Sequence, residues 1–169
     1  EEYITLEEKR RFDDINAKIA TLKVARVKKV GDLKAKIDGV NEKYEADLGE
    51  KVEPLVKEGQ KVQKSLEEKM DTTIRKEIEF EPTRDTIAEE GETISRKHLT
   101  ALNKAVQAKL NEIEEGMKEK RDMRIDALKM EIEQAKAEAE DEIIKLRDSL
   151  EEVSEEIRKT VDKDHEDLL

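Results

Sequence analysis

The side chains suited to acid–base or metal chemistry are two histidines, His98 and His165, and 45 aspartates and glutamates. Neither histidine has a second histidine four residues further on, the spacing that places two imidazoles around zinc on one helix face. The six glycines are dispersed, so no glycine-rich phosphate loop is present, and the chain has no cysteine. No sequence pattern implies a pocket that would recruit the carboxylates for catalysis. We therefore expect no enzyme activity, no metal and no cofactor.

The composition favours long helices over a globular core. Charged residues make up 47% of the chain, hydrophobic residues 35% and aromatic residues 2%. With so many charges facing water, the apolar residues fit a narrow stripe better than a round core. No apolar run approaches the roughly 20 residues that a membrane-spanning helix needs, and no signal peptide is recognisable. We expect a cytoplasmic protein without a transmembrane segment.

Apolar residues recur at helical spacing in both halves of the chain. Their steps of three and four average about 3.6 residues, which is the period of the α-helix. A stripe this narrow is unstable alone in water and needs a partner helix, from this chain or from another. We therefore predict that the chain self-associates through this stripe. The predicted self-association stripe consists of Ile15, Ile19, Leu22, Val30, Leu33, Ile37, Val40, Ile125, Leu128, Ile132, Ile143, Leu146, Leu150, Val153 and Ile157.

A second, weaker apolar stripe lies roughly opposite the first on a helical projection. It is compatible with scattered exposed alanines and valines, which need no explanation. It is also compatible with a lateral face through which coiled coils pack into bundles or filaments, and the helical spacing favours this second interpretation. Its members are Ala17, Ala20, Val24, Val27, Gly31 and Ala35 in the first half and Met123, Ala127, Met130, Ala137 and Ile144 in the second.

Charge is distributed unevenly along the chain. The segment 9–36 has ten basic and three acidic residues, which gives +7, and the segment 131–156 has eleven acidic and three basic residues, which gives −8. We predict salt-sensitive docking of the basic region on the acidic region of a staggered copy, or on an acidic polymer such as tubulin tails. The basic region lacks interleaved aromatic residues, so nucleic acid is not an expected partner. The candidate docking residues are Lys9, Arg10, Arg11, Lys23, Arg26, Lys28, Lys29, Lys34 and Lys36.

The chain contains two prolines, which mark the expected interruptions. Pro82 predicts a break at 81–86, between an N-terminal helical rod segment, 1–80, and an acidic C-terminal coiled-coil segment, 87–169. Pro54 lies inside the running stripe and predicts a kink. The predicted fold class is therefore all-α, a long kinked coiled-coil rod with breaks near Pro54 and Pro82.

The direction of the chain at the central break is left open. Thr86 and Glu89 have the spacing of a capping box, which predicts a helix that ends near Phe80 and a new helix that starts between Pro82 and Thr86. The connection lacks the glycine or asparagine that usually closes a helix before a tight reversal. An extended rod is therefore favoured, and a folded-back hairpin is the alternative.

Heptad-like runs with interruptions, the proline break and the terminal sequence RKTVDKDHEDLL resemble the striated-fibre assemblins and β-giardin, segmented coiled-coil proteins of protist flagellar roots and adhesive structures. The resemblance implies non-contractile filaments that lie along microtubules and assemble by lateral and staggered association. It also implies a place in the cytoskeleton, flagellar or ciliary.

The predicted function is structural: a coiled-coil protein that self-associates into a filament or rod. The predicted partners are further copies, tubulin or other coiled-coil proteins. One alternative is a membrane-surface helical dimer of the BAR type, against which the net charge of −11 argues. Another is a compact helical-bundle adaptor that binds protein partners.

Overall fold

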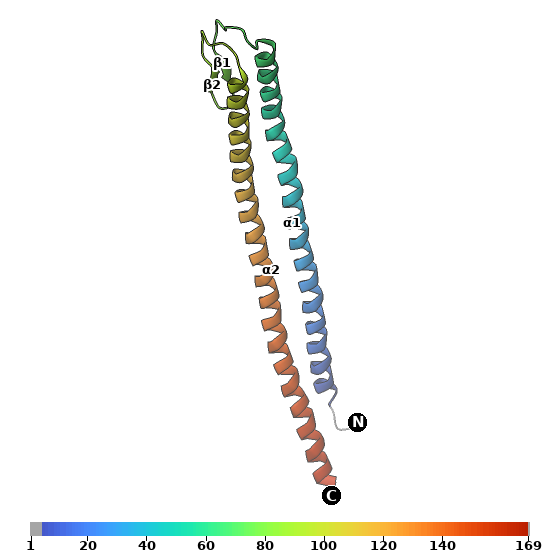
Figure 1. Cartoon of the computed structure of the whole chain (residues 1–169). Helices are drawn as coiled ribbons and strands as arrows, with labels where there is room; N and C mark the ends of the chain where they lie inside the picture. Colours follow the sequence, from blue (N-terminus) through green and yellow to red (C-terminus); the bar gives the residue numbers. More distant parts are fainter. Residues whose placement is uncertain (1–4, 169) are drawn as a thin grey trace. The chain divides into compact units, whose positions relative to one another are not determined.

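The computed structural model describes residues 5–168, and of residues 164, 165, 167 and 168 only the helical backbone. The elements follow in the order α1 (Leu6–Glu68), β1 (Ile78–Phe80), β2 (Asp85–Ala88) and α2 (Arg96–Leu168) (Figure 1). The two long helices confirm the all-α class in its main feature. The two short strands between them were not predicted.

The chain divides into two compact units, and each contains a stretch of both helices. Unit 1 comprises Glu1–Ile37 and Asp126–Leu169, and unit 2 is Asp38–Ile125. In unit 1, ion pairs join Arg11 to Glu156 and Arg26 to Glu140. Moving toward the N-terminus of α1 therefore corresponds to moving toward the C-terminus of α2, which is antiparallel pairing.

Unit 2 shows the same antiparallel pairing independently. The Arg121 guanidinium lies over the Tyr44 ring, and Gly59 lies against Val106. The helices of both units thus pair within one chain. The hairpin alternative describes each pair, and the extended connection that the sequence favoured does not.

The start of α1 is fixed by a capping box. The Glu8 N–H donates to Thr5 Oγ1 at 3.2 Å, and the Thr5 N–H donates to Glu8 Oε2 at 3.4 Å. Each side chain thereby satisfies a backbone donor that the first helical turn leaves without a partner. Glu7 and Glu8 also place negative charge at the positive end of the helix dipole.

The predictions that the first helix ends near Phe80 and that the second begins between Pro82 and Thr86 are wrong. α1 ends at Glu68, and α2 begins at Arg96. After α1, Asp71 adopts a left-handed conformation with a φ of 63°, and its N–H donates to Ile94 O instead of continuing the helix. The β-branched run that follows, from Thr72 to Ile74, has low helix propensity.

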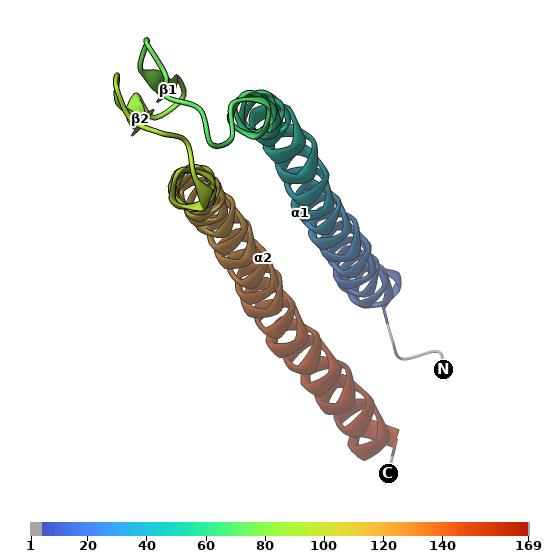
Figure 2. The same cartoon turned by 45° about the horizontal axis from the view of Figure 1, so that its top comes forward.

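The connection between the helices is a β-hairpin. β1 and β2 pair antiparallel, Phe80 opposite Asp85 and Glu79 opposite Thr86, with a register shift next to Ile78. The shift is a bulge, which lets the consecutive residues Ile87 and Ala88 both be buried. Figure 2 shows the hairpin beside the adjoining ends of α1 and α2.

Both prolines lie where a missing N–H is tolerated. Pro82 occupies the turn between the strands, where the Thr83 N–H donates to Phe80 O and the Arg84 N–H to Glu81 O. Pro54 lies within α1 at an exposed position, where water can replace the lost donor. α1 is continuous through Pro54, so the predicted break there is absent.

Each unit has its own core. The core of unit 2 combines both helices with the hairpin, and its fully covered side chains include Phe80, Leu66, Ile94 and Leu102. The core of unit 1 consists of apolar side chains from the facing sides of the two helices. Its buried members are Ile19, Val30, Leu33, Leu128, Ile132, Ala135, Ile143 and Val153.

Candidate functional site

The predicted self-association stripe is covered by the chain's own helices. Seven of its fifteen members are buried: Ile19, Val30, Leu33, Leu128, Ile132, Ile143 and Val153. The other eight, from Ile15 to Ile157, are half-buried. In both units the helix that faces the stripe is another part of the same chain. In this structure the stripe is therefore covered within the chain.

The predicted basic docking region also finds part of its partner within the chain. Arg11 Nη1 lies 3.3 Å from Glu156 Oε2, and Arg26 Nη1 lies 3.3 Å from Glu140 Oε2. Both carboxylates belong to the predicted acidic region. Exposed ion pairs of this kind each contribute about 0–1 kcal/mol. The other seven candidates are exposed: Lys9, Arg10, Lys23, Lys28, Lys29, Lys34 and Lys36.

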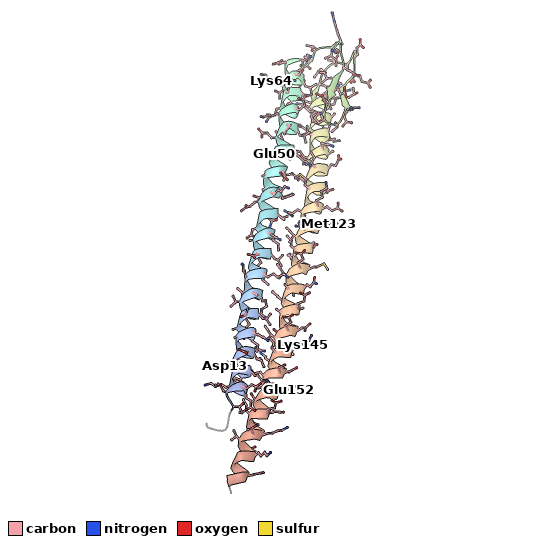
Figure 3. The ribbon with its side chains drawn as sticks, turned by 180° about the vertical axis from the view of Figure 1, so that it is seen from behind. Asp13, Glu50, Lys64, Met123, Lys145 and Glu152 are labelled. Atoms are coloured by element: carbon pink, nitrogen blue, oxygen red, sulfur yellow. The ribbon has the colours of Figure 1, made fainter. Side chains whose placement is uncertain are left out.

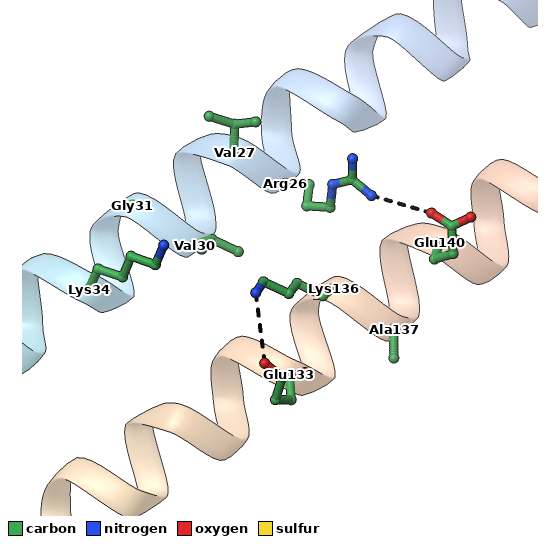
Figure 4. A pocket seen from close by; sticks show the side chains of 9 residues that line it. All are labelled: Arg26, Val27, Val30, Gly31, Lys34, Glu133, Lys136, Ala137 and Glu140. Carbon is green, nitrogen blue, oxygen red and sulfur yellow. Dashed lines mark hydrogen bonds and ion pairs between the residues drawn. The ribbon is translucent and has the colours of Figure 1, made fainter.

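A groove in unit 1 lies beside the second of these ion pairs (Figure 4). Arg26 reaches across it to Glu140, and Lys136 pairs with Glu133 at 3.7 Å along α2. Its lining charges are therefore largely paired with one another. The apolar part of the lining comes from Val27, Val30, Gly31 and Ala137.

The second predicted stripe is exposed. The large members are Val24, Val27, Met123, Met130 and Ile144, with exposed fractions from 46% for Ile144 to 73% for Met130. Met123 is labelled in Figure 3. The sequence positioned this stripe correctly on the side of each helix away from the buried stripe.

The stripe has a regular spacing that single exposed residues lack. On α1, the steps along Ala17, Ala20, Val24, Val27 and Gly31 alternate between three and four residues, a heptad pattern. We call these five residues the outer seam of α1. On α2, Met123, Met130, Ala137 and Ile144 occupy every seventh position, with Ala127 between the first two. We call these five the outer seam of α2.

A buried histidine closes the start of α2. His98 is 3% exposed, and its Nδ1 accepts the Ser95 N–H at 3.0 Å. Because Nδ1 is an acceptor, the proton is on Nε2, which donates to Glu92 Oε2 at 3.1 Å. Both ring nitrogens are thus used to hold the turn before α2. The arrangement resembles a capping box in which histidine replaces the usual glutamate.

Glu92 is held in its ionised form by the same turn. The backbone N–H of Glu89 and then the His98 ring lower the pKa of Glu92 from 4.5 to about 2. Burial opposes them, and the hydrogen bond and charge of Lys97 add further lowering. The Glu89 N–H donates to Glu92 Oε1 at 2.9 Å, and Lys97 Nζ lies 3.4 Å from Oε2. Sequence reasoning missed this cluster, because glutamate and histidine six residues apart have no characteristic helical or strand spacing.

A second groove, in unit 2, is basic. It is lined by Val40, Lys43, Tyr44, Asp47, Glu50, Lys51, Met117, Lys120, Arg121 and Arg124. Arg121 is fixed by the Tyr44 ring, with the guanidinium carbon 4.3 Å from the ring centroid, and by Asp122 at 3.1 Å. This groove was also missed. The basic run KEKRDMR at 118–124, inside the acidic half of the chain, was the available signal.

Among the described residues, no group of three or more histidines, aspartates or glutamates is arranged to hold a metal ion. Within the same part of the chain, neither helix has a stretch long and apolar enough to cross a membrane. Comparisons with protein-family models, with curated proteins and with solved structures gave no match.

Proposed function

We propose that this chain is a structural coiled-coil protein, without enzymatic activity, that self-associates into a filament or rod. The observation that carries the proposal is the pair of exposed outer seams. The buried stripes already supply the partner that each helix needs. The outer seams stay exposed after the helices of each unit have paired, so folding within either unit does not account for their spacing.

The spacing of the outer seams supports a helical partner. Scattered exposed apolar residues are normal on any protein surface. A repeat of seven residues is different, because it keeps an apolar line facing one neighbouring helix in a supercoil. The small residues Ala17, Ala20 and Gly31 also leave room for the close approach of a second backbone.

The proposal predicts association through the outer seams. Val24→Gln with Val27→Gln is expected to lower the average mass measured by analytical ultracentrifugation, while circular dichroism still reports full helicity. The control is Thr21→Gln with Ala25→Gln, which changes exposed, uncharged residues of the same helix outside both the seam and the candidate docking residues. A wild-type chain that stays monomeric at every concentration and salt would overturn the proposal and favour an adaptor.

The cytoskeletal part of the proposal comes from the resemblance to striated-fibre assemblins. It predicts that assembled material co-sediments with microtubules, through tubulin directly or through other coiled-coil proteins. Co-sedimentation that disappears with the seam substitutions would link it to assembly. Assembled protein that remains in the supernatant with microtubules present would remove tubulin as a direct partner and leave self-association standing.

A further inference from the structure

We propose that the basic groove of unit 2 in one copy binds the acidic segment 141–152 of α2 in a second copy, with Ile144 as its apolar anchor. The proposal rests on the self-association proposed above and assigns a surface to it. It differs from the predicted docking of the segment 9–36, part of whose charge is already paired within the chain.

The groove has an apolar floor and a basic rim. Val40, Tyr44 and Met117 supply apolar surface, and all three are half-buried. Five basic residues and two acidic residues, Asp47 and Glu50, line the groove. It therefore carries an excess of positive charge in a chain whose net charge is −11.

Most of that positive charge is available to a partner. Of the five basic residues, Arg121 is held by Tyr44 and Asp122. The other four are exposed, and none forms an ion pair within 4.0 Å among the residues that the structure describes: Lys43, Lys51, Lys120 and Arg124. A partner that brings carboxylates would pair with charges that this chain does not itself neutralise.

The segment 141–152 has the complementary chemistry. Ile144 is 46% exposed on the outer seam of α2. Asp141 and Asp148 lie three residues before it and four after it, so all three side chains share one helix face. Glu142, Glu151 and Glu152 extend the acidic surface. Arg147, three residues after Ile144, shares this face and Lys145 lies beside it, so the segment keeps five carboxylates against two cations.

The carboxylates of Asp141, Asp148, Glu151 and Glu152 are exposed. None forms an ion pair within the part of the chain that the structure describes. The segment therefore offers an apolar side chain between unpaired carboxylates. That is the reverse of the groove, which offers an apolar floor between unpaired cations.

The spacings of the two surfaces agree. Lys43 and Lys51 are eight residues apart on α1, or roughly 12 Å at 1.5 Å per residue. Asp141 and Asp148 are separated by roughly 10 Å on the same basis. Ile144 can therefore enter the groove near Tyr44 while each aspartate faces one lysine.

The partner that this geometry identifies is another copy of the chain. Arg124 and Ile144 belong to one continuous helix, α2, and residues so placed cannot meet each other within that helix. Both surfaces are present on every copy. No additional protein is needed to bring the two chemistries together.

The experiment reverses the charges on each side. Lys43→Glu with Lys51→Glu, and separately Asp141→Lys with Asp148→Lys, are each expected to weaken self-association roughly tenfold or more, because like charges then face each other. An equimolar mixture of the two variants is expected to recover association, since acidic grooves then meet basic segments. Analytical ultracentrifugation measures both effects. Lys64→Glu with Lys104→Glu is the matched control for the groove variant, because both lysines are exposed, lie outside the groove and change the net charge equally.

The outcomes separate this proposal from the one it rests on. If wild type associates, but the groove variant associates equally well or the mixture fails to recover, the groove assignment is overturned and self-association stands. If wild type is monomeric, both proposals fail. Binding of poly-glutamate by such a monomer would show that the groove takes an acidic partner other than a second copy.

Discussion

Gly59 of α1 lies so close to α2 that a Cβ atom at this position would meet Val106 Cγ2 at 3.0 Å. The absence of a side chain therefore sets how closely the two helices of unit 2 approach each other there. Gly49, ten residues earlier on the same helix, has nothing within 4 Å of the corresponding position. A substitution at Gly49 therefore tests helix propensity alone, whereas a substitution at Gly59 also tests the packing of α1 against α2.

Gly49→Ala is expected to raise the free energy of unfolding by about 0.5–1 kcal/mol, because alanine favours the helix over glycine. Gly59→Ala makes the same gain but pushes against a branched side chain, so it is expected to be neutral or destabilising. Urea unfolding followed by circular dichroism compares them. Equal stabilisation by both substitutions would mean that the helices separate at no cost.

Glu92 predicts a loss of stability in acid. Its folded pKa is about 2, below its ordinary value of 4.5. The ionised carboxylate therefore stabilises the folded state above pH 4.5, and this contribution is lost as the pH falls from 4.5 toward 2. Glu92→Gln is expected to be less stable at neutral pH and to show a smaller decline over that range.

Thermal unfolding from pH 7 to pH 2 measures the effect. Glu90→Gln is the control, because Glu90 is an exposed neighbour in the same loop that takes part in none of the bonds around Glu92. A decline of the same size in Glu92→Gln and in wild type would contradict the assignment.

The hydrogen bond that His98 accepts predicts that His98→Ala and His98→Gln lower the stability by different amounts. His98→Ala leaves the Ser95 N–H without its acceptor and is expected to cost about 1–3 kcal/mol. Glutamine can accept this N–H from the same helix position, as in an ordinary capping box, so His98→Gln is expected to cost less. Urea unfolding ranks the two. If glutamine is no better than alanine, the histidine acts through volume and not through the cap.

Phe80 predicts how strongly the hairpin is tied to the helices. Its side chain is fully covered in the core of unit 2, so Phe80→Ala is expected to cost about 3–5 kcal/mol. Phe12→Ala, at a half-buried position of α1 in unit 1, is the matched control and is expected to cost less. Denaturant unfolding gives both values, and similar costs would show that the hairpin is only loosely packed.

The sequence was sufficient to position the helix faces. The spacing of Ile19, Leu33 and Leu128 shows which side of each helix must be covered, because burial follows the helical turn whatever the partner is. It does not identify the partner. An extended oligomer and a folded-back chain bury the same residues.

The end of α1 was harder to predict for a related reason. Leu66, Met70, Ile74 and Ile78 continue the helical step of four residues, although α1 ends at Glu68. The spacing of Ile74 fits burial on the face of a longer helix, and it also fits burial in the hairpin connection, where Ile74 lies. The spacing therefore cannot distinguish the two. The three residues of β1 are too few for strand alternation to be recognised.

Backbone hydrogen bonds also join the two sides of the connection before β1 and after β2. The Ile74 N–H donates to Glu92 O, the Gly91 N–H to Ile74 O and the Ile94 N–H to Thr72 O. A trypsin cut after the exposed Arg84 would therefore leave the two fragments joined until a denaturant is added. One band on a native gel and two bands on a denaturing gel would show that non-covalent contacts hold the two fragments together.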